Sequence, residues 1–273
     1  MASVSVDAAL PAVVNGCLVP AGEASVPVLD EGFLRGDGAF EVVLLYEGHP
    51  FELEDHLRRL SASCRSLSLE CPLDLLTTDI GTVVEHCPSL STSVMRIVVT
   101  RGGVRVVFVQ PHLRVPAVSR LMPVAYQPQP MLAGSKSLSY ATNMQALRAA
   151  RDAGFDDALL VTQEGRVLEA QTASVFWATS AGELCTPPLS DGILDSITRR
   201  VIGRCVKVVE RSCSLETISA ASEVFLAGTA REIQAVSAVG EVQLPPAPGP
   251  VTQRAQEAFM RYVASSTAPV RNT

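Results

Sequence analysis

The sequence contains only two side-chain amines that a lysine-dependent reaction can use. Of its 22 basic residues 20 are arginines, and the other two are Lys136 and Lys207. An amine that is partly removed from water can attack a carbonyl carbon and then carry protons. Glu169 follows Lys136 by 33 positions and offers a carboxylate that can hold a proton on a ring nitrogen. Lysine chemistry therefore has two candidate amines, and an acidic partner follows the first of them.

The first half of the chain contains a glycine-rich segment between elements that can hold it. Residues 30–41, DEGFLRGDGAFE, include three glycines within seven positions, which permits positive φ and close backbone approach. Apolar residues at helical spacing predict an amphipathic helix over 53–69. Two β-rich runs, 95–100 and 104–110, flank the turn Arg101-Gly102-Gly103. The glycine-rich segment is either a loop that lines a site or an ordinary turn between strands.

Lys136 lies where the second half of the chain changes from strand to helix. A strand is predicted over 122–126, and a helix over 143–153 that ends at Gly154. A hairpin with its turn at 163–166 places Glu169 at the end of a strand. The remaining predicted elements are a strand over 174–178, a helix over 197–209, a strand over 223–226, a helix over 252–263 and a frayed end over the last ten residues.

Composition limits the partners and the compartment. The net charge is −6 and no basic run occurs, which argues against nucleic acid. No apolar stretch approaches the roughly 18 residues of a membrane span, and the first residues lack the pattern of a secretory signal. We therefore expect a soluble, cytoplasmic protein. The seven cysteines form no CxxC pair and no metal-ligand spacing with histidine, so we expect reduced thiols and no metal site.

These parts are the ones that a site for pyridoxal phosphate requires. Its aldehyde needs an amine, its pyridine nitrogen needs a carboxylate, and its phosphate needs backbone N–H groups and an arginine. The run from 136 to 199, KSLSYATNMQALRAARDAGFDDALLVTQEGRVLEAQTASVFWATSAGELCTPPLSDGILDSITR, resembles the signature region of the class IV aminotransferases. GDGAFE and HLRRL upstream and EVFLAGTAREI downstream resemble further motifs of that family. The matches extend from about residue 14 to residue 240 in the expected order.

The resemblance implies a set of contacts to pyridoxal phosphate. Lys136 would form the Schiff base and shuttle the α-proton, and Glu169 would pair with the pyridine nitrogen. Arg59, in the pattern H-x-x-R-L, would bind the phosphate. Arg58 would face solvent, because neighbouring helical residues point about 100° apart. Tyr140 would either bond the cofactor's phenolic oxygen or pack in the core.

Two turns would hold the phosphate through backbone N–H groups, according to the same resemblance. One turn opens the helix predicted from 197, and the other follows the strand predicted over 223–226. Ser196 stands where the family often has glycine, so the first turn must tolerate a side chain, whose hydroxyl would be near the phosphate. The residues of the two turns are Ser196, Ile197, Thr198, Thr229 and Ala230.

Recognition of the substrate carboxylate has several candidates by resemblance. Arg101 matches an arginine of D-amino-acid aminotransferases and aminodeoxychorismate lyases, and Arg96 matches approximately one of branched-chain aminotransferases. We take Arg101 first, because a glycine-flanked loop lets a guanidinium turn inward; the alternative is an ordinary arginine of a surface loop. Phe33 stands where D-amino-acid aminotransferases place a tyrosine, so that hydroxyl is missing. Arg35 in the same loop either replaces it or faces solvent.

Three functions are compatible with these motifs. Val42 favours transamination between an amino acid and a 2-oxo acid, because typical aminodeoxychorismate lyases carry threonine at this position. The alternative is the lyase, which eliminates pyruvate and releases 4-aminobenzoate for folate synthesis. Phe33 favours this alternative, because the tyrosine of D-amino-acid aminotransferases is missing at that position. A regulatory module without chemistry ranks far below, because both Lys136 and Glu169 are present.

The resemblance also implies the architecture. Fold type IV pyridoxal-phosphate enzymes have a small α+β N-terminal domain and a larger C-terminal domain with a barrel-like sheet. We place these domains at 1–117 and 125–273, joined by a linker at 118–124 near Pro111, Pro116 and Pro123. Relatives are commonly dimers, so we expect a homodimer that acts on amino and oxo acids.

Overall fold

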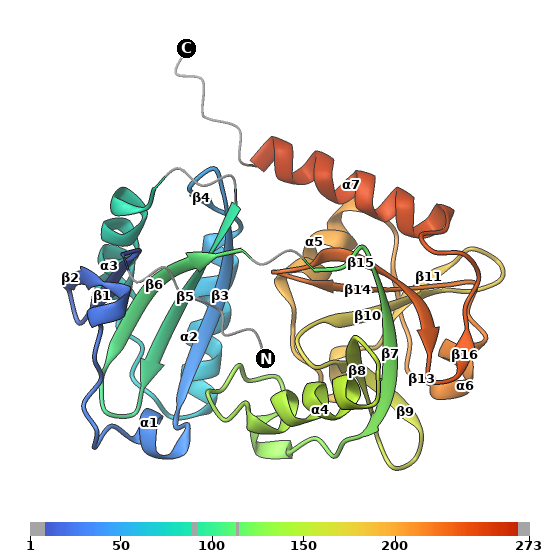
Figure 1. Cartoon of the computed structure of the whole chain (residues 1–273), viewed down its shortest axis with the longest axis horizontal. Helices are drawn as coiled ribbons and strands as arrows, with labels where there is room; N and C mark the ends of the chain where they lie inside the picture. Colours follow the sequence, from blue (N-terminus) through green and yellow to red (C-terminus); the bar gives the residue numbers. More distant parts are fainter. Residues whose placement is uncertain (1–8, 89–91, 113–114, 267–273) are drawn as a thin grey trace. The chain divides into compact units, whose positions relative to one another are not determined.

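The computed structural model describes residues 9–88, 92–112 and 115–266. The chain forms two units: unit 1 comprises residues 1–113 and 135–140, and unit 2 comprises 114–134 and 141–273. Each unit combines helices with a β-sheet (Figure 1), which confirms the predicted mixture of α and β structure. Lys136 belongs to unit 1, although the sequence on both sides of its six-residue segment belongs to unit 2.

Unit 1 is built on an antiparallel six-stranded sheet. The strand order is β2-β1-β6-β5-β3-β4. The longest pairing joins β3 and β5, from Gly38 opposite Thr100 to Tyr46 opposite Thr92. Strand β5 begins three residues before the start predicted at 95, where hydrophobic character is weaker but pairing continues. The strands are β1 (Pro11–Val14), β2 (Cys17–Pro20), β3 (Gly38–Tyr46), β4 (His49–Pro50), β5 (Thr92–Thr100) and β6 (Arg105–Pro111).

Helices α2 (Leu53–Ser66) and α3 (Leu73–His86) pack on one face of this sheet (Figure 1). Alternate residues of the strands point to this face, and they form a buried core with the apolar stripes of both helices. The helix predicted over 53–69 ends earlier, because Ser68 takes a left-handed conformation with φ 52°. The sequence analysis did not predict α3. The core includes Val43, Leu45, Leu60, Leu76, Ile80, Met95, Ile97 and Val107.

On the opposite face of the same sheet, the guanidinium of Arg96 lies among apolar side chains. Register pairs Val42 with Arg96, Arg96 with Phe108, and Phe108 with Ala12, so these four residues form one row across four strands. Phe40 lies on the same face as Val42, two residues earlier on β3. Val42, Arg96 and Phe108 are each only half-buried. This face therefore presents a guanidinium within an apolar surface.

Gly102 is a position where a side chain does not fit. A Cβ added there would lie 2.1 Å from Asp30 Oδ2, and Asp30 caps the short helix α1 (Glu31–Arg35) by accepting from Gly32 N at 2.8 Å. Asp30 also accepts from Thr100 Oγ1 at 2.7 Å. We expect Gly102→Ala to lower the free energy of unfolding by about 1–3 kcal/mol, the cost of overpacking.

Denaturant unfolding monitored by fluorescence or circular dichroism measures this change. The matched control is Gly81→Ala in α3, where an added Cβ meets nothing within 4 Å. This control is expected to raise stability by up to about 1 kcal/mol, because alanine has the higher helix propensity. Equal effects of the two substitutions would contradict the role given to Asp30.

Unit 2 is built on a mixed ten-stranded sheet. Its main path runs β12-β11-β10-β14-β15-β7-β8-β9-β13, and β16 pairs with β15. The pairs β15 with β7 and β7 with β8 are parallel, whereas β8 with β9 is an antiparallel hairpin. The strands are β7 (Val118–Ala125), β8 (Asp157–Val161), β9 (Arg166–Ala170), β10 (Ser174–Ala178), β11 (Leu184–Thr186), β12 (Val209–Glu210), β13 (Cys213–Ser214), β14 (Glu223–Gly228), β15 (Glu232–Val239) and β16 (Val242–Gln243).

Two hydrophobic clusters cover opposite sides of β8. Leu159 belongs to a core centred on the buried Trp177, and Leu160 packs with Ala146 and Ala150 of α4. This alternation explains why every residue of β8 is buried. The helix predicted over 197–209 ends at Cys205, because β12 begins at Val209. The helices of unit 2 are α4 (Ala141–Asp152), α5 (Ile197–Cys205), α6 (Leu215–Ser219) and α7 (Pro250–Ser266).

The segment that we interpreted as an interdomain linker forms strand β7. Residues 118–124 lie inside the sheet of unit 2, and the unit boundaries fall at 113/114, 134/135 and 140/141 instead. Pro123 is tolerated in this strand because pairing with β15 ends at Leu121. Tyr126 N donates to Val161 O on the β8 side, so by alternation the missing N–H of Pro123 faces the β15 side. The predicted fraying of the last residues falls mostly outside the described residues.

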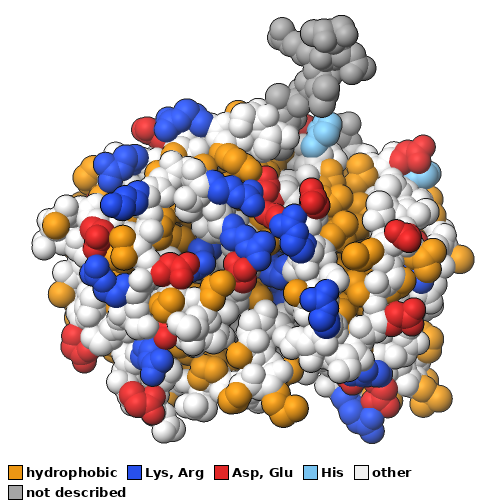
Figure 2. Space-filling model, turned by 180° about the vertical axis from the view of Figure 1, so that it is seen from behind, with side chains coloured by type: hydrophobic (Ala, Val, Ile, Leu, Met, Phe, Trp, Pro, Cys, Tyr) orange, Lys and Arg blue, Asp and Glu red, His pale blue; other side chains and the backbone are white. Residues whose placement is uncertain are grey.

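Charged side chains of both signs are interspersed on the face that Figure 2 draws. Among the described residues, several charged side chains form ion pairs, such as Arg211 with Glu183 and Arg200 with Asp195. No helix among the described residues is long and apolar enough to cross a membrane. In the same described ranges, no three His, Cys, Asp or Glu side chains gather as they would around a metal ion. All seven cysteines are free thiols.

Candidate functional site

Lys136 is held through its backbone and enclosed by aromatic rings. Its carbonyl accepts from Phe40 N at 3.0 Å, and its N–H donates to Ser63 Oγ at 3.0 Å. Strand β3 and helix α2 therefore both hold it. Its side chain is buried, with Nζ 4.4 Å from the Phe40 ring centre and 5.5 Å from the Tyr140 ring centre. Lysine is rarely buried unless it is paired. A buried lysine amine is suited to attack a carbonyl carbon and to transfer protons.

Tyr140 lies next to this amine, and Arg96 lies near Tyr140. The Tyr140 ring meets the Phe40 ring edge-on, with 5.4 Å between the ring centres. Burial lowers the pKa of Arg96, and Tyr140 is close enough to oppose that shift. Arg96 Nε donates to Gln110 Oε1 at 3.3 Å. The structure thus brings Lys136, Tyr140 and Arg96 to one face of unit 1.

Only one of the two adjacent arginines of α2 turns inward. Arg59 is buried, whereas the Arg58 side chain is 58% exposed and bonds to Asp55 and Glu54 of its own helix. Arg59 donates from Nε to Glu41 Oε1 and from Nη2 to Glu41 Oε2, both at 2.7 Å. The predicted phosphate arginine is therefore oriented by a buried carboxylate.

Glu41 also contacts a histidine. His56 Nδ1 lies 2.8 Å from Glu41 Oε2, and an ionised carboxylate only accepts, so Nδ1–H donates. Burial by itself raises the pKa of Glu41, but the charge of Arg59 and hydrogen bonds from Arg59 and His56 outweigh it and hold that pKa far below its usual range. Burial lowers the pKa of His56 against the pull of Glu41, so His56 is neutral and Glu41 is charged at neutral pH.

Arg101 is already engaged by unit 1. Its Nε and Nη2 bond to Asp37 at 3.0 and 3.2 Å. Its Nη1 and Nη2 also donate to the carbonyls of Ser68 and Leu67, just after the end of α2, at 2.6 and 2.7 Å. The guanidinium of Arg101 therefore donates its hydrogen bonds to acceptors within unit 1. Arg101, our first choice for the substrate carboxylate, therefore joins the turn after β5 to the residues that follow α2.

Phe33 and Arg35 lie on the short helix α1. Phe33 is 68% exposed, and Arg35 pairs with Glu31 of the same helix. The structure does not show a contact of either residue with Lys136 or Arg96 among the described residues of unit 1.

In unit 2, Glu169 lies near the end of β9 and is half-buried. Its Oε1 accepts from Leu194 N at 3.2 Å, which ties β9 to the turn before α5. Burial raises the pKa of Tyr126, and the negative charge of Glu169 raises it further, so the two side chains are close.

The first turn of α5 and the turn after β14 lie near the same end of β9. Ser196 caps α5, with its Oγ accepting from Arg199 N, and Ile197 and Thr198 are buried. N–H groups in the first turn of a helix have no intrahelical acceptor. Thr229 and Ala230 form the turn between β14 and β15, directly after Gly228. A Cβ at Gly228 would lie 3.0 Å from Thr172 O, so this turn packs against the residues that follow β9.

The residues in the two units fit pyridoxal phosphate. Unit 1 supplies a buried amine and an oriented guanidinium, which match an aldehyde and a phosphate. Unit 2 brings together a carboxylate, a helix N-terminus and a second turn, which match a pyridine nitrogen and a phosphate. Each group of the cofactor thus has a partner of suitable chemistry in the described residues.

Neither Glu41 nor His56 was assigned a role from the sequence, although both lie in the motifs GDGAFE and HLRRL. A signal was present in each case. Glu41 is a charged residue at the start of the apolar run EVVLLY, and His56 precedes Arg59 by three positions, which places both on one face of a helix.

Comparison with known proteins defines the family. The sequence model of the family described as "Amino-transferase class IV" matches residues 38–239. A protein of Methanocaldococcus jannaschii named "Putative branched-chain-amino-acid aminotransferase" is 32% identical, over 90% of this chain and 93% of its own. The branched-chain aminotransferase of Thermoproteus uzoniensis, solved with norvaline, has a TM-score of 0.87 and 28% identity, over 95% of this chain and 96% of its own. An aminodeoxychorismate lyase of Bacillus subtilis is 25% identical, over 92% and 94%.

The chain belongs to the class IV aminotransferases. The fold is that of the fold type IV transaminases, as predicted. Enzymes of this class use pyridoxal phosphate and move an amino group between an amino acid and a 2-oxo acid, so the expected cofactor and reaction are confirmed at the level of the family.

Proposed function

We propose that this aminotransferase takes branched-chain amino acids as amino donors and that Lys136 is its catalytic amine. When bound, pyridoxal phosphate supplies an aldehyde and an electron-withdrawing ring. Lys136 Nζ would bind the aldehyde and move the substrate α-proton, and the carboxylate of Glu169 would keep the ring nitrogen protonated. Tyr140, which lies beside Lys136, would bond the phenolic oxygen. The phosphate would be held by Arg59, Ser196, Ile197, Thr198, Thr229 and Ala230.

One observation carries the choice of donor. The sheet face beside Lys136 presents Phe40, Val42 and Phe108 around the guanidinium of Arg96. An amino acid with an apolar side chain and a carboxylate complements this surface, because apolar area is removed from water while the carboxylate gains a charge-assisted bond. The branched-chain aminotransferases among the similar proteins support the same choice.

A panel of donors tests the reaction. The purified protein with pyridoxal phosphate and 2-oxoglutarate is given both enantiomers of leucine, valine and alanine, and the 2-oxo acid products are measured. We expect the branched donors to give the highest kcat/KM. The lyase is the weaker alternative. Faster release of pyruvate and 4-aminobenzoate from aminodeoxychorismate than of any 2-oxo acid would overturn the proposal.

We propose Arg96 rather than Arg101 as the carboxylate-binding residue, and the bonds of Arg101 within unit 1 support this choice. We expect Arg96→Leu to raise KM for leucine by about 10²-fold, since one charge-assisted hydrogen-bonding partner is lost. Arg101→Leu is expected to change KM by less than about threefold and to lower stability instead, because its partners are Asp37 and the carbonyls after α2. Steady-state kinetics and thermal unfolding of both variants measure this. A large rise in KM for Arg101→Leu alone would restore Arg101.

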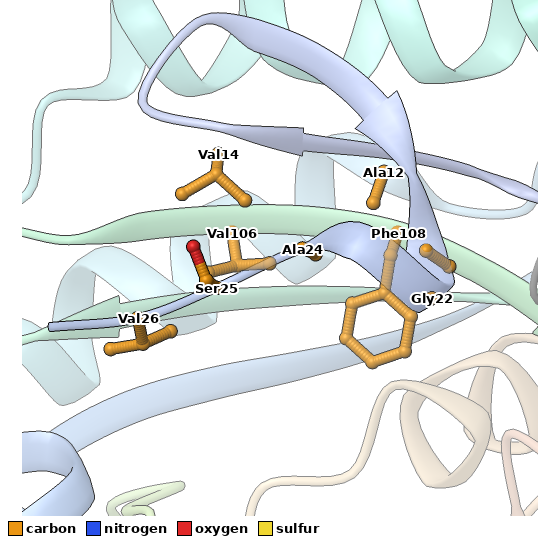
Figure 3. A pocket seen from close by; sticks show the side chains of 9 residues that line it. Ala12, Val14, Gly22, Ala24, Ser25, Val26, Val106 and Phe108 are labelled. Carbon is orange, nitrogen blue, oxygen red and sulfur yellow. The ribbon is translucent and has the colours of Figure 1, made fainter. Parts of the chain in front are cut away.

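We also propose a cytoplasmic homodimer. Support comes from apolar side chains exposed on one segment of unit 1, where Val28 is 68% and Leu29 80% exposed. Beside it, β1, β6 and residues 21–26 line a cavity of about 330 Å³ whose walls are mostly apolar, with the Phe108 ring at one end and Val26 at the other (Figure 3). Exposed apolar patches mark subunit contacts. Sedimentation equilibrium tests the dimer, and Leu29→Glu is expected to weaken it.

A further inference from the structure

Glu41 is a buried carboxylate in the sheet of unit 1 that no step of the reaction uses directly. It is fully buried in β3 and is bound by two residues of α2. Arg59 takes both of its oxygens at 2.7 Å, and His56 adds a third contact at 2.8 Å. With a longer contact from Val42 N at 3.4 Å, these donors satisfy most of the capacity of one carboxylate. The positions of the two charged side chains are therefore fixed, because moving either Glu41 or Arg59 leaves the other as a buried charge without its partner.

This contact orients a side chain that is otherwise flexible. An arginine side chain has many rotamers, but a two-point bond through Nε and Nη2 determines both the position and the plane of the guanidinium. His56 precedes Arg59 by three residues on α2, so both approach Glu41 from the same face of the helix. Orientation before binding lowers the entropy cost of holding a ligand.

The same contact joins the two elements that hold Lys136. Phe40, the neighbour of Glu41 on β3, donates to the carbonyl of Lys136, and Ser63, one turn after Arg59 on α2, accepts from its N–H. The bonds of Glu41 thus tie β3 to α2 where both meet the Lys136 backbone. We propose that Glu41, supported by His56, is a positioning residue that orients Arg59 toward the cofactor phosphate. This inference rests on the proposed role of Arg59 as the phosphate arginine.

The phosphate group gives the inference a specific readout. Apo-protein of the full chain is titrated with pyridoxal phosphate and, separately, with pyridoxal, which has the same aldehyde and ring but no phosphate. Glu41→Gln keeps the size of the side chain and removes its charge. We expect its affinity for pyridoxal phosphate to fall about 10- to 100-fold, the range found when outer partners of metal ligands are removed. Its affinity for pyridoxal is expected to change by less than about threefold.

A matched control separates positioning from general destabilisation. Asp79 forms another buried ion pair in unit 1, with Arg105 Nε at 3.0 Å. Asp79→Asn is expected to lower stability without changing the ratio of the two affinities. An equal loss of both affinities in Glu41→Gln, or no loss of either, would overturn the inference. If Glu41→Gln does not fold, His56→Asn keeps the Glu41–Arg59 pair, and it is expected to shift the same ratio by a smaller factor; an unchanged ratio there overturns the inference too.

Arg59→Ala distinguishes a failure of the inference from a failure of the proposed function. We expect Arg59→Ala to lose affinity for pyridoxal phosphate but not for pyridoxal, and Glu41→Gln to add little to it in the double variant. If Arg59→Ala shifts the ratio and Glu41→Gln does not, Glu41 has no positioning role and Arg59 keeps its own. If Arg59→Ala leaves the ratio unchanged, the assignment of Arg59 fails and the role of Glu41 fails with it.

Discussion

Replacing Lys136 with alanine is expected to lower kcat for transamination by about 10⁴-fold, the upper range for loss of a general acid–base group. The reason is the position of its amine, which lies buried beside the rings of Phe40 and Tyr140. Borohydride treatment of the wild-type protein with pyridoxal phosphate is expected to attach the cofactor to the peptide that contains residue 136. Mass spectrometry of the digest measures this attachment, and Lys136→Ala is expected to lose it.

Lys207→Ala is the matched control, because the chain offers no other lysine. Lys207 is exposed and follows α5 in unit 2. We expect this variant to keep its kcat and its attachment site. Retained attachment in Lys136→Ala, or activity within tenfold of wild type, would show that Lys136 is not the catalytic amine.

Glu169→Gln has the second largest expected effect. An amide cannot keep a proton on the ring nitrogen, so we expect kcat to fall by about 10²- to 10³-fold, the cost of removing one group that stabilises developing charge. The amide oxygen can still accept from Leu194 N, so the thermal midpoint is expected to change little. Steady-state kinetics give the first number and thermal unfolding the second. Glu164→Gln, in the exposed turn of the same hairpin, serves as the control.

The ionisation of Tyr126 reports the same substitution independently of activity. Burial and the charge of Glu169 both raise the pKa of Tyr126. Removing the negative charge makes the phenolate less unfavourable, so the pKa of Tyr126 is expected to move down toward its ordinary value in Glu169→Gln. Ultraviolet titration, with Tyr126→Phe subtracted, measures this shift. An unchanged titration would place Glu169 away from Tyr126.

The hydrophobic periodicity of the sequence predicted which elements carry the site more accurately than it predicted the residues at which these elements end. Helical spacing placed a helix at 53–69 and separated Arg58 from Arg59, and the structure turns only Arg59 inward. These features depend on neighbours within one helix turn. The helix stops at Ser66 because Ser68 adopts a positive φ, which apolar spacing does not encode.

Features that depend on distant residues were less accessible from the sequence. Arg101 was chosen because glycines follow it, but Asp37 and the carbonyls after α2 bind its guanidinium. The prolines around 118–124 suggested a linker, yet Pro123 fits a strand whose pairing with β15 has already ended. The role of Glu41 requires knowing that β3 packs on α2. In each case the deciding partner lies far away in the sequence.

The return of residues 135–140 to unit 1 constrains how genes for such enzymes can recombine. A single crossover at residue 113 would import Glu41, Arg59 and Arg96 from one parent and leave the Lys136 segment of the other. The imported Phe40 N–H and Ser63 hydroxyl would then have to match a foreign backbone. Functional chimaeras are therefore expected to carry a junction after residue 140, or two junctions that move this short segment together with its sheet.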